Sequence, residues 1–175
     1  MIQKWNNLDF EIILALIKSE NHLREISKLT KIPIATLSRK LFELRKQNII
    51  DYKTEGKNKV YFLKKNLISQ KAVIASENYK CIKLLIEYPK LMTIFEDILE
   101  KSNLIILFGS YAKGIPKENS DIDLYMETKE KIRNDLFNIK TGKFNCNDLL
   151  IKEIIKNHVI IKGTELYYEK LKFFE

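Results

Sequence analysis

Two short hydrophobic segments with different periods constrain the fold of this 175-residue chain more than any other feature. Residues 103–108, "NLIILF", are an almost continuous apolar run, which is typical of a strand buried on both faces, and a Gly-Ser pair follows directly. Residues 121–126, "DIDLYM", alternate strictly, so that Asp121 and Asp123 share one face of a second strand. The sequence therefore predicts a sheet in the C-terminal part of the chain, with two carboxylates on one side of it.

The N-terminal third has the periodicity of helices, followed by that of a β-hairpin. The whole chain holds five Gly and three Pro, which favours helices with short connections. Three segments repeat apolar residues at helical spacing, and Pro33 separates the last two of them. Two runs of β-branched and aromatic residues follow, joined by turn residues around Gly56. The predicted helices are residues 8–18, 21–30 and 34–47, and the predicted strands are 49–53 and 59–63.

Positive charge is concentrated in this part of the chain. Residues 1–66 hold 14 Lys and Arg against 7 Asp and Glu, whereas the remainder holds 17 against 16. A local excess of positive charge favours a polyanionic partner such as nucleic acid, although a solubilising Lys-rich surface is an alternative interpretation.

The three predicted helices and the basic hairpin resemble the winged helix-turn-helix family over about the first 65 residues. In that family the third helix enters the major groove and the hairpin contacts the flanking backbone. The resemblance therefore implies DNA binding, while a winged helix that only docks a protein or forms a dimer remains the alternative. The residues that the resemblance assigns to DNA are Thr36, Ser38, Arg39, Lys40, Lys57 and Lys59.

The middle of the chain is predicted to be helical, with a break at Pro89. Residues 67–100 carry no catalytic spacing, and their apolar side chains could connect two domains or form a homodimer seam. We therefore expect an α+β protein with a winged helix-turn-helix domain, a helical connector and a domain built on a small mixed sheet flanked by helices. The predicted boundaries are 1–66, 67–100 and 101–175.

The Gly-Ser pair and the two acids have the chemistry of a phosphate and metal site. Gly109 has no side chain, so a phosphate can approach the backbone closely, and Ser110 adds a hydroxyl donor. Asp121 and Asp123 on one face repel each other unless a cation lies between them. Hard oxygen ligands that leave open positions suit Mg²⁺ bound together with a substrate phosphate.

An apolar strand, Gly-Ser, ten residues and Asp-x-Asp together resemble the signature of the polymerase β-type nucleotidyltransferase superfamily, especially its minimal members. The resemblance implies a nucleoside triphosphate held by Gly109 and Ser110, and Mg²⁺, two ions if the domain is active, bound by the catalytic residues Asp121 and Asp123. It also implies transfer of a nucleoside monophosphate to an acceptor hydroxyl, which could belong to a protein such as a partner toxin, to RNA or to a small molecule.

The sequence departs from this pattern at the third carboxylate, which the superfamily usually carries on the next strand. The candidate strands "FNIK" and "KFNC" offer Asn138 and Asn145 instead, while Asp135 and Asp148 are expected on helices. Two alternatives to an enzyme therefore stay open. One is a transcriptional regulator that senses a nucleotide without transferring it, and the other is an antitoxin-like protein that binds a partner.

The chain has no run of 18 apolar residues, and its first residues lack the apolar core of a signal peptide. We therefore expect a cytoplasmic protein without membrane contact.

Overall fold

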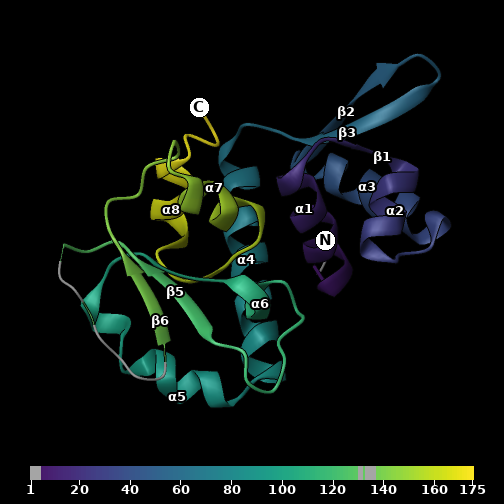
Figure 1. The fold of residues 1–175 in the computed structure, drawn as a ribbon. Helices are drawn as coiled ribbons and strands as arrows, with labels where there is room; N and C mark the ends of the chain where they lie inside the picture. The colour runs from purple at the N-terminus through teal and green to yellow at the C-terminus, as the bar shows by residue number, and fades with distance from the viewer. Residues whose placement is uncertain (1–4, 130–131, 133–136) are drawn as a thin grey trace. The chain divides into compact units, whose positions relative to one another are not determined.

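The computed structural model describes residues 5–129, 132 and 137–175. It divides into two compact units, which are coloured from purple to yellow along the chain in Figure 1. The N-terminal unit comprises the residues up to Tyr79 together with Phe174 and Glu175, and the C-terminal unit comprises Lys80–Phe173. The division falls inside the segment that the sequence predicts as a connector.

The N-terminal unit is a winged helix-turn-helix, as the sequence predicts. Three helices precede a β-hairpin, and the short strand β1 pairs antiparallel with β3 at the edge of the hairpin, giving the sheet order β1-β3-β2. The long helix α4 begins in this unit, where Tyr79 stacks on Phe10 with ring centroids 5.1 Å apart. The elements are α1 (Asn7–Lys18), β1 (Asn21–His22), α2 (Leu23–Thr30), α3 (Ile34–Lys46), β2 (Ile50–Glu55), β3 (Asn58–Leu63) and α4 (Leu67–Glu87).

Local sequence explains where the first helix begins. The Asn6 side chain accepts a hydrogen bond from the Leu8 N–H at 3.1 Å, and the Asn6 N–H donates to Asp9 Oδ2 at 2.9 Å. These two bonds form a capping box, in which a side chain at each end satisfies a backbone group of the first turn. The cap is therefore Asn6.

The C-terminal unit contains a four-stranded mixed sheet. Its order is β6-β5-β4-β7, with β5 and β6 parallel and the other pairs antiparallel. All four residues of β4 are buried, as expected for the "IILF" segment. The elements are α5 (Lys90–Glu96), η1 (Leu99–Lys101), β4 (Ile105–Phe108), α6 (Gly109–Ala112), β5 (Ile122–Met126), β6 (Phe137–Thr141), α7 (Leu149–Lys156), β7 (Val159–Lys162) and α8 (Thr164–Lys170).

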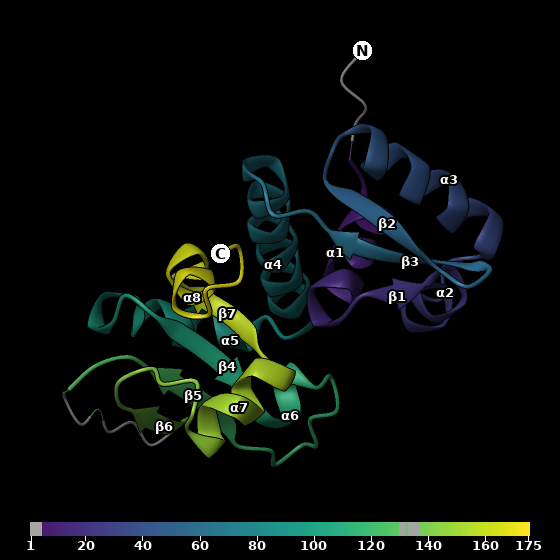
Figure 2. The ribbon, with the colours of Figure 1, turned by 90° about the horizontal axis from the view of Figure 1, so that it is seen from above.

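The two faces of this sheet are covered differently. In Figure 1 the sheet lies between α5 on one side and α7 and α8 on the other, and Figure 2 shows the α7 and α8 side from above. On the α5 side, Leu107 and Leu124 join Leu91 and Phe95 in one buried apolar cluster. Strand alternation turns Asp123 toward the opposite side.

The predicted α+β fold is confirmed, and the differences are local. Strand β6 forms over the predicted "FNIK" segment, whereas "KFNC", the alternative, forms no strand. The segment around Asp135, where the sequence predicts a helix, lies largely outside the described residues. Within the described part of the chain, each helix is too short or too polar to cross a membrane.

Candidate functional site

The turn after β4 brings Gly109 against Asp123. Phe108 pairs with Asp123 across the antiparallel ladder, and Gly109 follows with a φ of +72°. A side chain at residue 109 would place its Cβ 2.1 Å from Asp123 Oδ2. Glycine is therefore required at this position for two reasons: it tolerates the left-handed backbone, and it leaves room for the Asp123 carboxylate.

Asp123 is held from its other side by Asn138. The two residues pair in the parallel register of β5 and β6, and Asn138 Nδ2 donates a 2.8 Å hydrogen bond to Asp123 Oδ1. Asp123 is half-buried and Asn138 is exposed, so this contact lies at an open part of the sheet. The Asp123 carboxylate is thus fixed between a glycine backbone and an amide donor.

The other two predicted site residues lie on connecting segments. Asp121 is exposed and immediately precedes β5, so the ladder does not fix its orientation. Ser110 is half-buried in the four-residue helix α6. The structure brings Gly109 and Asp123 together directly, and it places Ser110 and Asp121 next to them in sequence.

Asn138 occupies the position in the neighbouring strand where a third carboxylate is expected. Asn145 lies in the following loop, where its side chain accepts a 3.0 Å hydrogen bond from the Asn147 N–H, and Asp148 is the residue immediately before α7. Asp135 lies outside the described residues. Among the residues that are described, no three His, Cys, Asp or Glu side chains are grouped so that they could hold a metal ion.

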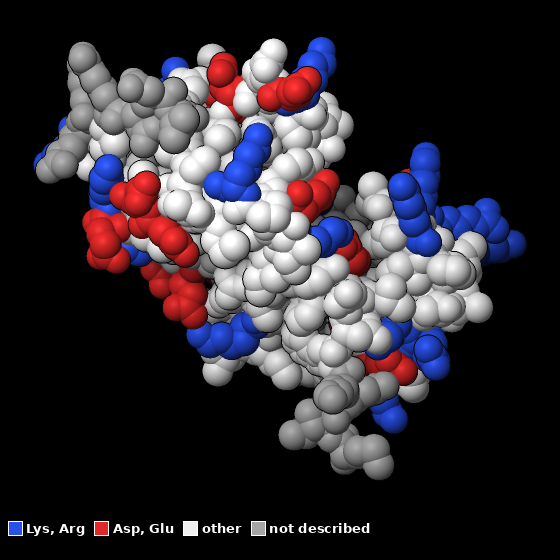
Figure 3. Space-filling model, turned by 90° about the horizontal axis from the view of Figure 1, so that it is seen from below, with Lys and Arg blue, Asp and Glu red and all other residues white. Residues whose placement is uncertain are grey.

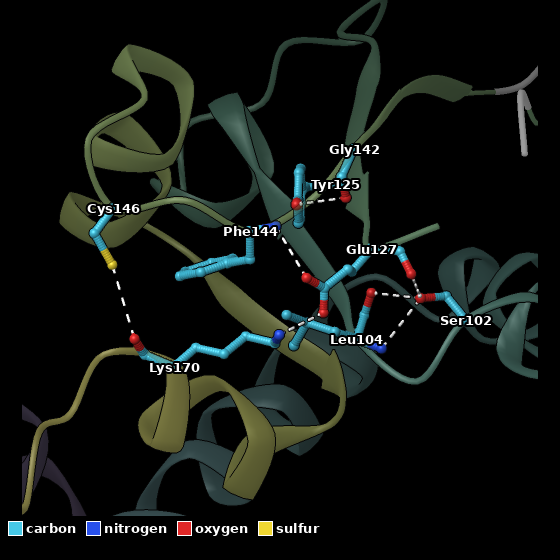
Figure 4. A network of polar contacts seen from close by, with 8 residues as sticks. All are labelled: Ser102, Leu104, Tyr125, Glu127, Gly142, Phe144, Cys146 and Lys170. Carbon is cyan, nitrogen blue, oxygen red and sulfur yellow. Dashed lines mark hydrogen bonds and ion pairs between the residues drawn. The ribbon is translucent and has the colours of Figure 1, made fainter. Parts of the chain in front are cut away.

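The far end of the same sheet face is closed by a polar network (Figure 4). Glu127 accepts a 2.9 Å hydrogen bond from the Phe144 N–H and forms a 2.7 Å ion pair with Lys170 of α8. The Tyr125 hydroxyl donates to the Gly142 carbonyl at 2.9 Å, and burial together with the charges of Glu127 and Asp148 raises the pKa of Tyr125. The segment after β6 is thereby held over Tyr125, whereas Asp123 and Asn138 remain accessible.

The side chains at Asp123 suit one divalent cation better than two. Two carboxylates separated by one residue are hard oxygen donors, and the Asn138 amide oxygen is a neutral donor of the same class. A second ion would need further negative charge, and the described residue beside Asp123 on β6 supplies an amide in that place. The residues thus fit a single metal ion bound together with a phosphate.

The predicted DNA-binding residues of the N-terminal unit are mostly accessible. Ser38 and Arg39 are exposed on α3, and Thr36 is half-buried. Lys57 is exposed in the hairpin turn, and Lys59 is exposed as the second residue of β3, with its ammonium 4.3 Å from the Tyr52 ring centroid. On the face seen in Figure 3, blue Lys and Arg side chains predominate on the N-terminal unit, while red Asp and Glu side chains gather mainly on the C-terminal unit.

Lys40 is a correction to the predicted DNA-binding set. It is 6% exposed, and its ammonium lies 2.9 Å from Asp9 Oδ2 and 3.4 Å from Glu43 Oε2. Leu37, Lys40, Leu41 and Leu44 follow the i, i+3, i+4, i+7 spacing of a buried helix face. The spacing in the sequence thus indicates that Lys40 faces the core. Its positive charge favoured the other interpretation, an exposed side chain that contacts DNA.

Two apolar residues of α3 face outward. Ile34, the first of the apolar residues at helical spacing in this segment, is 50% exposed, and Phe42 is 58% exposed. Phe42 follows Leu41, so it lies about 100° around the helix from the buried row. That offset is the sequence signal by which Phe42 could have been assigned to the exposed face.

Comparisons with known proteins agree with the geometry of the C-terminal unit. Residues 90–169 match the family described as "Polymerase beta, Nucleotidyltransferase". The search of curated proteins finds no match.

Two solved structures show a partial likeness to the chain. The crystal structure of a zinc-responsive MarR family member, Lactococcus lactis ZitR, aligns with a TM-score of 0.40 and 15% identity, covering 58% of this chain and 65% of that one. A mutant of ZitR aligns with a TM-score of 0.42 and 18% identity, covering 58% of this chain and 72% of that one. The family match and the contact of Gly109 with Asp123 point to the same part of the chain: residues 90–169 match the polymerase β nucleotidyltransferase family, and both Gly109 and Asp123 lie within them.

Proposed function

We propose that this protein binds DNA through its winged helix and uses its C-terminal domain to transfer a nucleoside monophosphate from a nucleoside triphosphate to an acceptor hydroxyl. The observation that supports the nucleotide site most strongly is the contact between Gly109 and the Asp123 carboxylate. This contact puts a backbone that a phosphate can approach beside an oxygen ligand for a divalent cation.

Each site residue has a distinct role in this proposal. Gly109 leaves the backbone accessible to the triphosphate, and the Ser110 hydroxyl donates a hydrogen bond to a phosphate oxygen. Asp121 and Asp123 hold Mg²⁺, and Asn138 keeps the Asp123 carboxylate oriented through its 2.8 Å hydrogen bond. The cation, when bound, neutralises the charge of the triphosphate.

The transfer step balances as a displacement at the α-phosphorus. The acceptor oxygen forms a bond to phosphorus, the bond from the α-phosphorus to the bridging oxygen of the β-phosphate breaks, and pyrophosphate leaves. The hydroxyl proton needs a base, and the Asn138 amide cannot accept it at neutral pH. Asp121 and Asp123 are the carboxylates at the proposed site, and water is the remaining acceptor for this proton.

Removing both acids is expected to abolish nucleotide binding and transfer. The test uses the full chain with Mg²⁺, α-labelled ATP, GTP, CTP or UTP, and bacterial cell extract as the source of acceptors. We expect a labelled product with the parent and at least a hundredfold less with Asp121→Ala/Asp123→Ala, because the phosphate charge is no longer neutralised. Equal labelling by parent and variant would refute the catalytic role of these acids.

A second candidate function is nucleotide sensing without transfer, and the amide at residue 138 favours it. Asn138 donates a hydrogen bond to Asp123, at the position where a further carboxylate would bind a second ion or take a proton. In this case the parent binds a nucleoside triphosphate in a calorimetric titration but labels no acceptor, and the nucleotide alters DNA affinity.

Asn138→Asp is expected to discriminate between the two functions. The new carboxylate adds a metal ligand and a base beside Asp123, so transfer should rise about tenfold or more if the missing acid limits the reaction. Without Mg²⁺ the two carboxylates repel each other, and the melting temperature of the C-terminal unit should fall and then recover when Mg²⁺ is added. The matched control is Asn145→Asp, which adds the same charge in the loop before α7; an equal Mg²⁺ response in both variants would contradict the assignment.

The proposed DNA contact combines the exposed side of α3 with the hairpin. Ser38 and Arg39 are accessible on the helix, and Lys57 and Lys59 are accessible on the hairpin. Lys and Arg that neutralise phosphates make binding depend strongly on salt concentration. The proposal also includes a homodimer, which is common among winged-helix regulators. It includes a protein partner such as a toxin, by analogy with small members of the nucleotidyltransferase family. A DNA-binding protein of this kind is proposed to act in the cytoplasm.

A further inference from the structure

The exposed face of α3 combines apolar and basic side chains in a regular row. Ile34, Ser38 and Phe42 follow one another at intervals of four residues, so they lie along one side of the helix. Ile34 is 50% and Phe42 58% exposed, and Ser38 is exposed between them. Arg39 is exposed next to this row.

The acidic side chain of α3 itself is directed away from this face, and the partly exposed Asp51 of β2 is paired with Arg45 at 3.2 Å. Glu43, the acidic residue of α3, turns toward the buried Lys40 ammonium at 3.4 Å, and 17% of its side chain is exposed. Lys46 instead lies on the exposed side, with its ammonium 5.6 Å from the Phe42 ring centroid. The face is therefore positive at Arg39 and Lys46 and apolar at Ile34 and Phe42.

This combination fits the interior of a DNA major groove better than the phosphate backbone alone. Phosphates offer charge but no apolar surface, so contact with them would leave Phe42 and Ile34 in water. The thymine base presents a C5-methyl group in the major groove, where an apolar side chain can pack against it. The positive charge around the aromatic ring complements the phosphates on either side of the groove.

We propose that Phe42, assisted by Ile34, packs against thymine C5-methyl groups, so that α3 selects sites with thymine at fixed positions. The inference rests on the proposed DNA binding and adds the base that the helix selects. Arg39 next to this row supplies charge and base-edge hydrogen bonds that do not require the methyl group.

The test removes the methyl group and nothing else. Full-length protein selects duplexes from a pool with a random 20-base-pair core, and each thymine of the selected duplex is then replaced in turn by deoxyuridine. We expect binding to weaken about fourfold at one or two positions, since one buried methyl group contributes about that factor. With Phe42→Ala the difference between thymine and uracil should disappear at one of these positions at least.

Two controls separate the methyl contact from general effects. Arg39→Ala should weaken binding to both duplexes while preserving the preference for thymine. Leu149→Ala changes a residue that is 82% exposed on the C-terminal unit, and it should alter neither affinity nor preference. Because Phe42 is largely exposed, its variant should keep the melting temperature of the parent, which circular dichroism checks.

The outcomes distinguish this inference from the function on which it rests. A selected duplex that binds equally well at every thymine-to-uracil replacement, or a preference that survives in Phe42→Ala, overturns the methyl contact and leaves DNA binding intact. Failure to retain any duplex at low salt overturns both proposals and assigns the Phe42 face to a protein partner instead.

Discussion

Gly109→Ala is expected to weaken nucleotide binding strongly, whereas Gly114→Ala should preserve it. Both glycines have a left-handed backbone, with φ of +72° and +71°, but only the first lies against Asp123, the proposed metal ligand. A Cβ at residue 109 would lie 2.1 Å from Asp123 Oδ2, whereas a Cβ at Gly114 would meet no atom within 4 Å. The Asp123 carboxylate must therefore move in the first variant and can stay in place in the second.

The two variants separate backbone strain from damage to the site. Alanine in the left-handed region costs about 1–2 kcal/mol, so both variants should lose about that much free energy of unfolding. Only Gly109→Ala should weaken binding of a nucleoside triphosphate with Mg²⁺, by about tenfold or more, because displacing a positioned group by an ångström has effects of this order. Calorimetric titration with each triphosphate measures the affinity, and thermal melting measures the stability. Nucleotide binding that falls equally in both variants would mean that the Gly109–Asp123 contact is not part of the site.

Lys40→Met is expected to destabilise the N-terminal unit by about 3–5 kcal/mol, because the variant leaves a buried carboxylate without its cation. Lys40 and Asp9 are 6% and 3% exposed, and their charged atoms are 2.9 Å apart. The same Asp9 oxygen accepts the Asn6 N–H of the capping box, so the start of α1 is linked to the middle of α3. Denaturant unfolding followed by circular dichroism measures the loss.

Two further variants identify the cause of this loss. Asp9→Asn/Lys40→Met removes both charges and keeps an oxygen for the Asn6 N–H, so it should be more stable than Lys40→Met alone. Lys53→Met breaks an exposed pair with Glu20 and should change stability little, because solvent screens such pairs. If Lys40→Met instead lowered DNA affinity without changing stability, the side chain would belong to the DNA surface and its buried position would be incorrect.

The helices and strands could be predicted from the sequence where the apolar periodicity was regular and where proline residues separated the segments. Pro33 and Pro89 separate helices because proline disfavours helix at the preceding residue, and the alternation of "DIDLYM" predicts β5. The first helix begins at Asn7, one residue before the predicted start at residue 8, and Asn6 is its cap although the adjacent Asn7 offers the same chemistry. The prediction that Lys40 faces DNA was wrong. Its aliphatic stem fits the buried apolar row of α3, and its ammonium pairs with Asp9 of α1.

The sequence by itself determined the order of the elements, the apolar strand before Gly109 and the spacing that brings Asp123 back to it, because these depend on residues near one another in the chain. Only the tertiary structure decided which side chains meet across elements. The parallel pairing of β5 with β6 puts the Asn138 amide on Asp123, and the packing of α1 on α3 buries Lys40 against Asp9. Such pairings depend on strand register and helix packing, which are set by the burial of the whole core and not by any local pattern.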